Sequence, residues 1–88
     1  MELGQIVYSK AGRDSGKYFC VVEIVGEDRV KIADGDLRRI KRAKTKNVKH
    51  LSTDGDLLAK VAEKLKAGQQ VFDAELFSAL RFYNENKK

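Results

Sequence analysis

Basic side chains are concentrated in one short stretch of the 88-residue chain, and their number and spacing suit a charged ligand. Residues 34–50 contain seven Lys or Arg against two Asp, and this excess equals the whole net charge of +5. The flanking segments, 1–33 and 51–88, are each neutral. Charge concentrated in this way predicts a polyanionic partner, and a solvated basic loop is the alternative. The basic residues of the stretch are Arg38, Arg39, Lys41, Arg42, Lys44, Lys46 and Lys49.

The chemistry of these side chains favours RNA over DNA. Several cations within a dozen residues can neutralise several phosphates, and the release of counterions makes such binding fall steeply with salt. Folded RNA also presents 2′-hydroxyls and unstacked bases, and arginine can both pair with a phosphate and stack on a base. No predicted helix carries the cluster of Arg or Lys that would enter the major groove of DNA.

A glycine-bounded loop, residues 12–17, is the second candidate for phosphate binding. Its sequence, GRDSGK, differs from a P-loop, because three residues instead of four separate the glycines and a tyrosine follows the lysine. We therefore exclude nucleotide hydrolysis. Glycines at both ends allow a tight turn, from which Arg13 and Lys17 can project toward phosphates, or lie in solvent as ordinary hairpin charges.

The residues that most often carry catalysis or metal binding are scarce. His50 is the only histidine and Cys20 the only cysteine, so a zinc site and a disulfide within the chain are not expected. Cys20 lies in an apolar stretch, where a thiol is normally unreactive. We expect no enzyme activity, no metal and no cofactor.

The first half of the chain predicts five short strands joined by tight turns. We expect them at 6–10, 18–25, 29–33, 37–42 and 48–51, from β-branched and aromatic residues and the turns between them. Asp34-Gly35 is a hairpin signal, because both residues tolerate a positive φ. Five short strands avoid exposed edges by closing on themselves, so a small barrel is predicted within residues 1–52.

The second predicted strand is apolar on both faces. We expect one face to point inward, and it contains Tyr18, Cys20, Val22 and Ile24. The opposite face contains Phe19, Val21 and Val25, and we expect it to be covered by C-terminal helices. Tyr18 is thereby assigned to the core, whereas the sequence leaves open whether Tyr8 packs inside or stacks on bases.

Residues 53–88 predict two helices that pack on the barrel as part of one domain. The first is expected to be capped by Thr53 or Asp54 and to end at Gly68. Its apolar stripe is Leu58, Val61, Ala62 and Leu65. Asp73 is the expected cap of the second helix, and residues 84–88 are expected to be frayed. The second stripe is Leu76, Phe77, Leu80 and Tyr83.

Two segments resemble a known family. Residues 4–17, GQIVYSKAGRDSGK, with the apolar strand and acidic turn after them, resemble the KOW motif of ribosomal proteins and NusG-type elongation factors. Residues 42–51, RAKTKNVKHL, resemble the basic segment of small KOW-domain ribosomal proteins of the archaeal and eukaryotic large subunit. Together these segments cover roughly residues 3–51.

The resemblance implies an SH3-like β-barrel that binds RNA without catalysis. By motif position it implies that Gly12 forms the turn and that Arg13 and Lys17 flank it on the RNA side. Ribosomal relatives often continue into longer C-terminal regions, whereas two compact helices follow here, which fits a stand-alone KOW-domain RNA-binding protein of the bacterial kind. The implied basic segment contains Lys44, Lys46, Lys49 and His50.

We therefore expect a non-catalytic RNA-binding protein of translation, with structured ribosomal RNA or a ribosomal subunit as partner. No small-molecule substrate is expected. The longest apolar run, residues 18–22, is too short to span a membrane and no signal peptide is visible, so we expect a cytoplasmic location. The alternative is an SH3-like protein–protein module of the translation or transcription machinery. The expected RNA-binding residues are Lys10, Gly12, Arg13, Lys17, Arg38, Arg39, Lys41, Arg42, Lys44, Lys46, Lys49 and His50.

Overall fold

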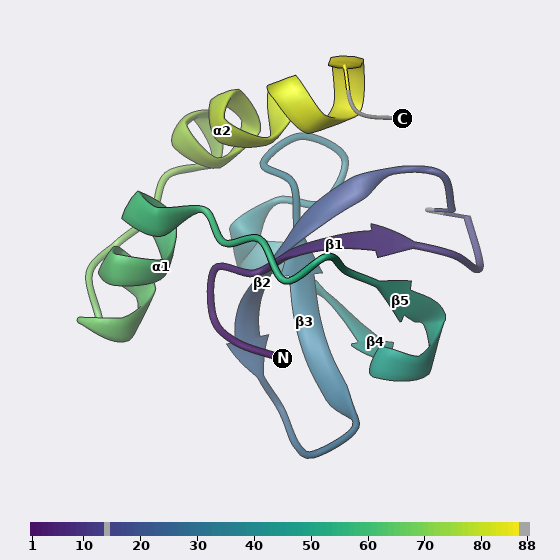
Figure 1. Ribbon diagram of the computed structural model, residues 1–88. Helices are drawn as coiled ribbons and strands as arrows, with labels where there is room; N and C mark the ends of the chain where they lie inside the picture. The colour runs from purple at the N-terminus through teal and green to yellow at the C-terminus, as the bar shows by residue number, and fades with distance from the viewer. Residues whose placement is uncertain (14, 87–88) are drawn as a thin grey trace.

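A five-stranded antiparallel sheet with two C-terminal helices makes up the computed structural model, which describes residues 1–13 and 15–86 (Figure 1). The strand order in the sheet is β4-β3-β2-β1-β5. The predicted mainly β fold followed by two helices is therefore confirmed. The elements are β1 (Ile6–Ser9), β2 (Tyr18–Ile24), β3 (Arg29–Ala33), the 3₁₀-helix η1 (Ile40–Arg42), β4 (Lys44–Asn47), the 3₁₀-helix η2 (Val48–His50), β5 (Leu51–Ser52), α1 (Ala59–Lys66) and α2 (Asp73–Asn86).

The sheet is strongly curled, because its two edge strands follow each other in the chain. In a flat five-stranded sheet, β4 and β5 would lie about 19 Å apart, at about 4.8 Å per strand. Only the three residues of η2 separate them, and a 3₁₀-helix rises about 2 Å per residue. The edges must therefore come together. Among the described residues, no ladder of hydrogen bonds pairs β4 with β5, so the predicted closed barrel is not formed by strand pairing.

The first three strands agree with the sequence prediction, and the last two do not. The predicted strand at 37–42 is wrong: an irregular loop and η1 occupy this stretch, and β4 starts at Lys44. The Asp34-Gly35 hairpin is also wrong. The Asp34 carboxylate accepts hydrogen bonds from the N–H groups of Asp36 (2.9 Å) and Arg38 (2.8 Å), which stabilises a wider loop. Of the predicted strand at 48–51, residues 48–50 form η2 and β5 begins at Leu51.

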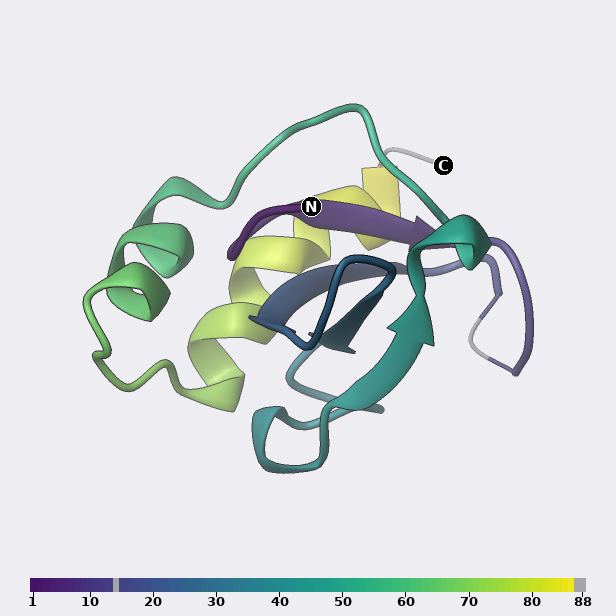
Figure 2. The ribbon, with the colours of Figure 1, turned by 90° about the horizontal axis from the view of Figure 1, so that it is seen from below.

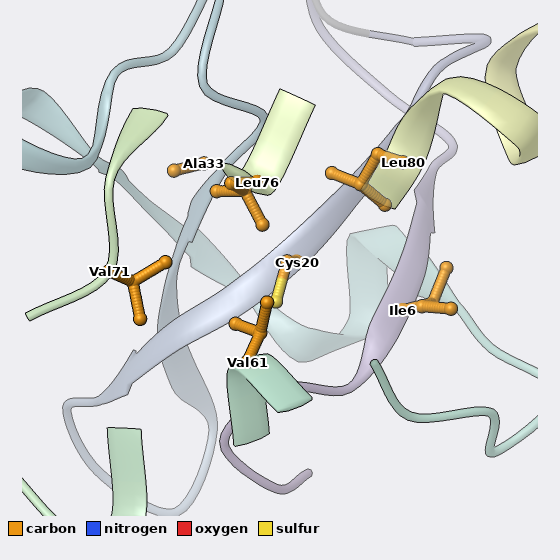
Figure 3. Packing of buried hydrophobic residues seen from close by; sticks show 7 residues of the cluster. All are labelled: Ile6, Cys20, Ala33, Val61, Val71, Leu76 and Leu80. Carbon is orange, nitrogen blue, oxygen red and sulfur yellow. The ribbon is translucent and has the colours of Figure 1, made fainter. Parts of the chain in front are cut away.

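The two faces of β2 are assigned in the reverse of the prediction. Phe19 and Val21 are fully buried inside the curled sheet, and β1, β3 and β5 add the rest of this inner core, Val7, Val30, Ile32 and Leu51. The helices cover the Cys20 face instead (Figure 3). This outer core contains Ile6, Cys20, Ala33, Val61, Val71, Leu76 and Leu80. Ile24 and Val25, at the end of the strand, are exposed.

The first helix starts later than predicted, and the proposed cap has another function. Helix α1 begins at Ala59, after Leu58, without a side-chain cap. The Thr53 hydroxyl instead donates to the Ile6 carbonyl oxygen (2.7 Å) and so attaches the connecting segment to β1. Gly68 has φ +73° and directly follows the last helical turn, as predicted. The predicted stripe of α1 is confirmed, with Val61 and Ala62 buried and the two leucines packed against the core.

Helix α2 packs with Leu76 and Leu80, whereas Phe77 of the predicted stripe is 44% exposed. The expected fraying at 84–88 is wrong as far as the structure describes this segment, since α2 continues through Asn86 and residues 87–88 lie outside the described part. The Asn84 side chain accepts a hydrogen bond from the Tyr18 N–H (2.9 Å) and donates one to its carbonyl oxygen (3.4 Å). β3 ends opposite Cys20 and does not reach Tyr18. The side-chain amide of Asn84 therefore makes the hydrogen bonds to Tyr18 that a neighbouring strand would otherwise make.

Candidate nucleic-acid interface

The loop between β1 and β2 is a tight, hydrogen-bonded hairpin. Gly12 and Gly16 have φ values of +84° and +90°, in the left-handed region that favours glycine. The β ladder continues beyond the strands, because the Ser9 N–H donates to Lys17 (3.0 Å) and the Gly16 N–H donates to Ser9 (2.9 Å). The exposed side chain of Arg13 therefore projects from a fixed base.

Lys46 joins this loop to β4. It lies in β4 opposite Val30, only 8% of the residue is exposed, and its Nζ donates to the Ala11 carbonyl oxygen at 2.7 Å. A Cβ atom on Gly12 would lie 3.1 Å from this Nζ, so glycine is favoured there both by φ and by space. The sequence predicts Lys46 as an RNA contact. The structure gives this side chain a contact within the fold, and its contact with RNA stays a prediction.

A second contact joins the loop to η2. The Lys10 N–H donates to the His50 carbonyl oxygen at 2.9 Å. At the start of η2, the Asn47 side chain accepts from the Lys49 N–H at 3.0 Å, which fixes the turn that displays the exposed Lys49 side chain. Figure 2 shows η2 beside the 10–17 loop, so Lys10, Arg13 and Lys49 come from neighbouring segments at one end of β4.

Other basic residues lie at the opposite end of β4, on the loop that includes η1. The helix α2 holds this loop at two points. The Ile40 N–H donates to the Asp73 carboxylate at 2.8 Å, and Gly35 approaches the backbone of α2 so closely that a Cβ would lie 2.1 Å from the Asp73 carbonyl oxygen. Asp73 was predicted as the cap of α2, but it is the first helical residue, and its carboxylate fixes the loop.

We call the basic residues of β4, of the 10–17 loop, of η2 and of the loop that includes η1 the β4 band. The band follows an edge strand of the sheet and both turns beside it (Figure 2). Lys44 on the strand is half-buried, as are Arg38, Lys17 and His50, and Lys44 and Arg38 take part in interactions of their own. The predicted cluster therefore contains exposed cations at both ends of β4 and half-buried or buried basic residues both on the strand and beside it. The exposed members of the band are Lys10, Arg13, Arg39, Lys41, Arg42 and Lys49.

Two observations concern the Cys20 thiol and the possible metal ligands. Burial raises the pKa of the Cys20 thiol to about 12, so the group stays protonated and unreactive at neutral pH. Within the parts that the structure describes, no three His, Cys, Asp or Glu side chains are grouped closely enough to hold a metal ion.

The sequence analysis missed residues that position the band. Asp34 and Asp73 bind backbone N–H groups of the basic loop, and their turn-forming type was the only signal available. Tyr18 is half-buried beneath α2 instead of lying in the inner core, and its ring meets those of Tyr8 and Tyr83. The sequence could not pair these tyrosines, because the pairing depends on how α2 docks.

Comparison with protein-family models found no match, and a search of curated proteins found no similar sequence. The resemblance to KOW domains therefore stays a prediction from the motif residues. Among residues 1–13 and 15–86, no helix is long and apolar enough to cross a bilayer.

Proposed function

We propose that this protein is a non-catalytic RNA-binding module that holds structured RNA, and specifically ribosomal RNA, against the β4 band. The observation that carries the proposal is the placement of the whole net charge of +5 in residues 34–50, with Arg39, Lys41, Arg42 and Lys49 exposed at the two ends of β4. Association with a ribosomal subunit, and a cytoplasmic location, follow from the same proposal.

The band suits RNA because its backbone is fixed before binding. Asp34, Asp73 and Lys46 hold the two turns by hydrogen bonds, so the exposed cations lose little backbone freedom when phosphates arrive. Arginines at one end can pair with phosphates in a bidentate manner or stack on an unstacked base. Lysines at the other end act as point charges.

The proposal includes an SH3-like barrel of the KOW type. The curled sheet supports it, because both edge strands meet at η2 and enclose the inner core of Phe19, Val21 and Ile32. The tight glycine loop at Gly12 and the basic segment 42–51, which contains β4, also support it. The hydrogen bond from Lys46 to the Ala11 carbonyl oxygen joins the two motif segments, which is a physical reason for their spacing in the chain.

A protein–protein module that used the outer face of the sheet would need this apolar face to be uncovered. The helices cover the outer face, and the opposite face is the inner core.

The test is binding to a folded ribosomal RNA fragment as a function of salt, measured by fluorescence anisotropy. If the four exposed cations named above contact phosphates, the slope of log K against log salt is about −3, at about 0.7 per contact. Affinity then falls about 60-fold between about 50 and 200 mM salt. The variant Arg39→Glu/Arg42→Glu should lose at least about tenfold in affinity and show a shallower slope.

The matched control is Lys60→Glu/Lys66→Glu, which changes the net charge equally on exposed positions of α1. This control should bind within about twofold of wild type. Equal loss of affinity in both variants would mean that total charge, and not the β4 band, determines binding. Sedimentation of a cell lysate through a gradient at low and high salt then tests whether the protein migrates with a ribosomal subunit.

A further inference from the structure

An aromatic groove outside the β4 band is lined by acidic instead of basic side chains. It opens where β1, β2 and α2 meet the segment after β5, and its volume is about 180 Å³. This volume is below the range of about 300–1,000 Å³ found for small-molecule pockets, so the groove suits a single side-chain head group. The residues that define its chemistry are Tyr8, Tyr18, Tyr83, Thr53, Asp54 and Asp56.

The three tyrosine rings form a continuous wall. The rings of Tyr8 and Tyr18 have centroids 5.1 Å apart at 63°, and those of Tyr18 and Tyr83 are 5.8 Å apart at 50°. Because neighbouring rings are tilted, they do not stack face to face, and all three tyrosines line the groove. Asn84 bonds to both backbone groups of Tyr18 and so holds α2 against the wall.

The opposite side of the groove is a short segment with two carboxylates. The Thr53 hydroxyl donates to Ile6 (2.7 Å) and accepts from the Gly55 N–H (3.0 Å), while the Ile6 N–H donates to the Asp56 carbonyl oxygen (2.9 Å). These bonds fix the backbone on both sides of Asp54. The side chains of Asp54 and Asp56 are exposed at the mouth.

We propose that this groove binds the guanidinium group of an arginine in a basic segment of a partner protein. A cation within about 6 Å of a tyrosine face is attracted by the ring, and a carboxylate can accept two parallel hydrogen bonds from guanidinium. Phosphates of RNA would instead meet the repulsion of Asp54 and Asp56. Basic flexible segments are common in proteins that bind nucleic acid, so such a partner fits a protein that holds RNA elsewhere on its surface.

The experiment is an NMR titration of the ¹⁵N-labelled protein with the blocked peptide Gly-Ser-Arg-Ser-Gly and with its citrulline analogue. Citrulline keeps the shape of arginine and lacks the charge. The arginine peptide should shift the amide signals of Tyr8, Tyr18 and Asp54 in a saturable manner and bind about tenfold more tightly than the analogue. Equal shifts with both peptides, or no shifts at these residues, overturn the proposal.

Two variants separate this site from the β4 band. Asp54→Asn should weaken binding of the arginine peptide several-fold and leave RNA binding unchanged, whereas Glu63→Gln, an exposed control on α1 with the same charge change, should affect neither. Arg39→Glu/Arg42→Glu should lose RNA and keep the peptide. If a short single-stranded RNA saturates the groove signals and competes with the peptide, the groove is a nucleobase site and the proposal is wrong.

Discussion

Replacement of Lys46 by Met distinguishes a structural from an RNA-binding function of this side chain. Methionine keeps an unbranched apolar stem and removes the ammonium group. In the structure that group donates to the Ala11 carbonyl oxygen at 2.7 Å, and 8% of the residue is exposed. The substitution therefore removes the side-chain bond from Lys46 to the Ala11 end of the loop and leaves the surrounding core almost unchanged.

The expected cost follows from three effects. A hydrogen bond from a charged donor contributes about 1.5–3 kcal/mol to stability. Ala11 is half-buried, so water can partly replace the lost donor, and methionine avoids the desolvation of a buried charge. We expect the free energy of unfolding to fall by about 1–2 kcal/mol, which lowers Tm by about 5–15 °C in a domain of this size.

Thermal unfolding followed by circular dichroism measures the stability. RNA titrations at several salt concentrations show whether the side chain contacts a phosphate. Lys49→Met is the matched control, because Lys49 is exposed three residues away. It should unfold within about 0.5 kcal/mol of wild type and reduce the salt slope by about 1. Lys46→Met should unfold earlier and leave the salt slope unchanged. A Lys46→Met protein that melts like wild type and shows the reduced slope would refute this assignment.

Substitutions at Gly35, Asn84 and Cys20 test the packing on which the fold and its sites depend. Gly35→Ala should lower stability by at least about 2 kcal/mol in urea unfolding, because φ is +82° and the added Cβ would meet the Asp73 carbonyl oxygen; a neutral result would contradict the packing of this loop on α2. Asn84→Ala should cost about 1–2 kcal/mol and speed hydrogen exchange of the Tyr18 amide, whereas Asn84→Asp should keep the bond to that amide; unchanged exchange in the Ala variant would count against the docked helix. The pKa of the Cys20 thiol, raised by burial from 9.0 to about 12, predicts stability that is complete below pH 9 and is lost as pH rises toward 12, because the unfolded thiol ionises first. Cys20→Ala should remove this alkaline component, and identical pH profiles for the two proteins would show that the thiol does not cause it.

The sequence predicts those strands whose pattern is local. β1, β2 and β3 are predicted from β-branched and aromatic residues and the turns between them, and each agrees with the structure within one residue. The segment 37–42 failed because its conformation depends on distant partners. The Asp34 carboxylate binds two backbone N–H groups of the loop, and Asp73, far along the chain, binds a third. Such side-chain bonds compete with strand pairing and leave no periodic signal.

The faces of β2 were reversed because both are apolar. Periodicity separates two faces of a strand but does not say which one lies inside a curled sheet. The register shift between Val21 and Glu23 adds to the difficulty, since an irregular residue breaks the alternation on which the assignment depends. The size of the side chains gives the better argument after the fact: Phe19, with Val7 and Ile32, fills the inner core, whereas the smaller Cys20 leaves room for Leu76 and Leu80 of the helices.

The basic segment shows why a binding motif cannot be taken residue by residue from its charge. Charge alone ranks Lys46 with Lys49, yet β4 carries Lys46 to the loop, where its ammonium replaces solvent around the Ala11 carbonyl, and η2 leaves Lys49 exposed. An ammonium that already donates to a backbone carbonyl has fewer N–H groups to offer a phosphate, but it fixes the loop from which Arg13 projects. A lysine of this segment can stabilise the fold or stay exposed for binding. The element on which the lysine lies, β4 for Lys46 and η2 for Lys49, determines which of the two it does. A search for RNA contacts in this protein should therefore begin with the exposed cations on the turns beside β4.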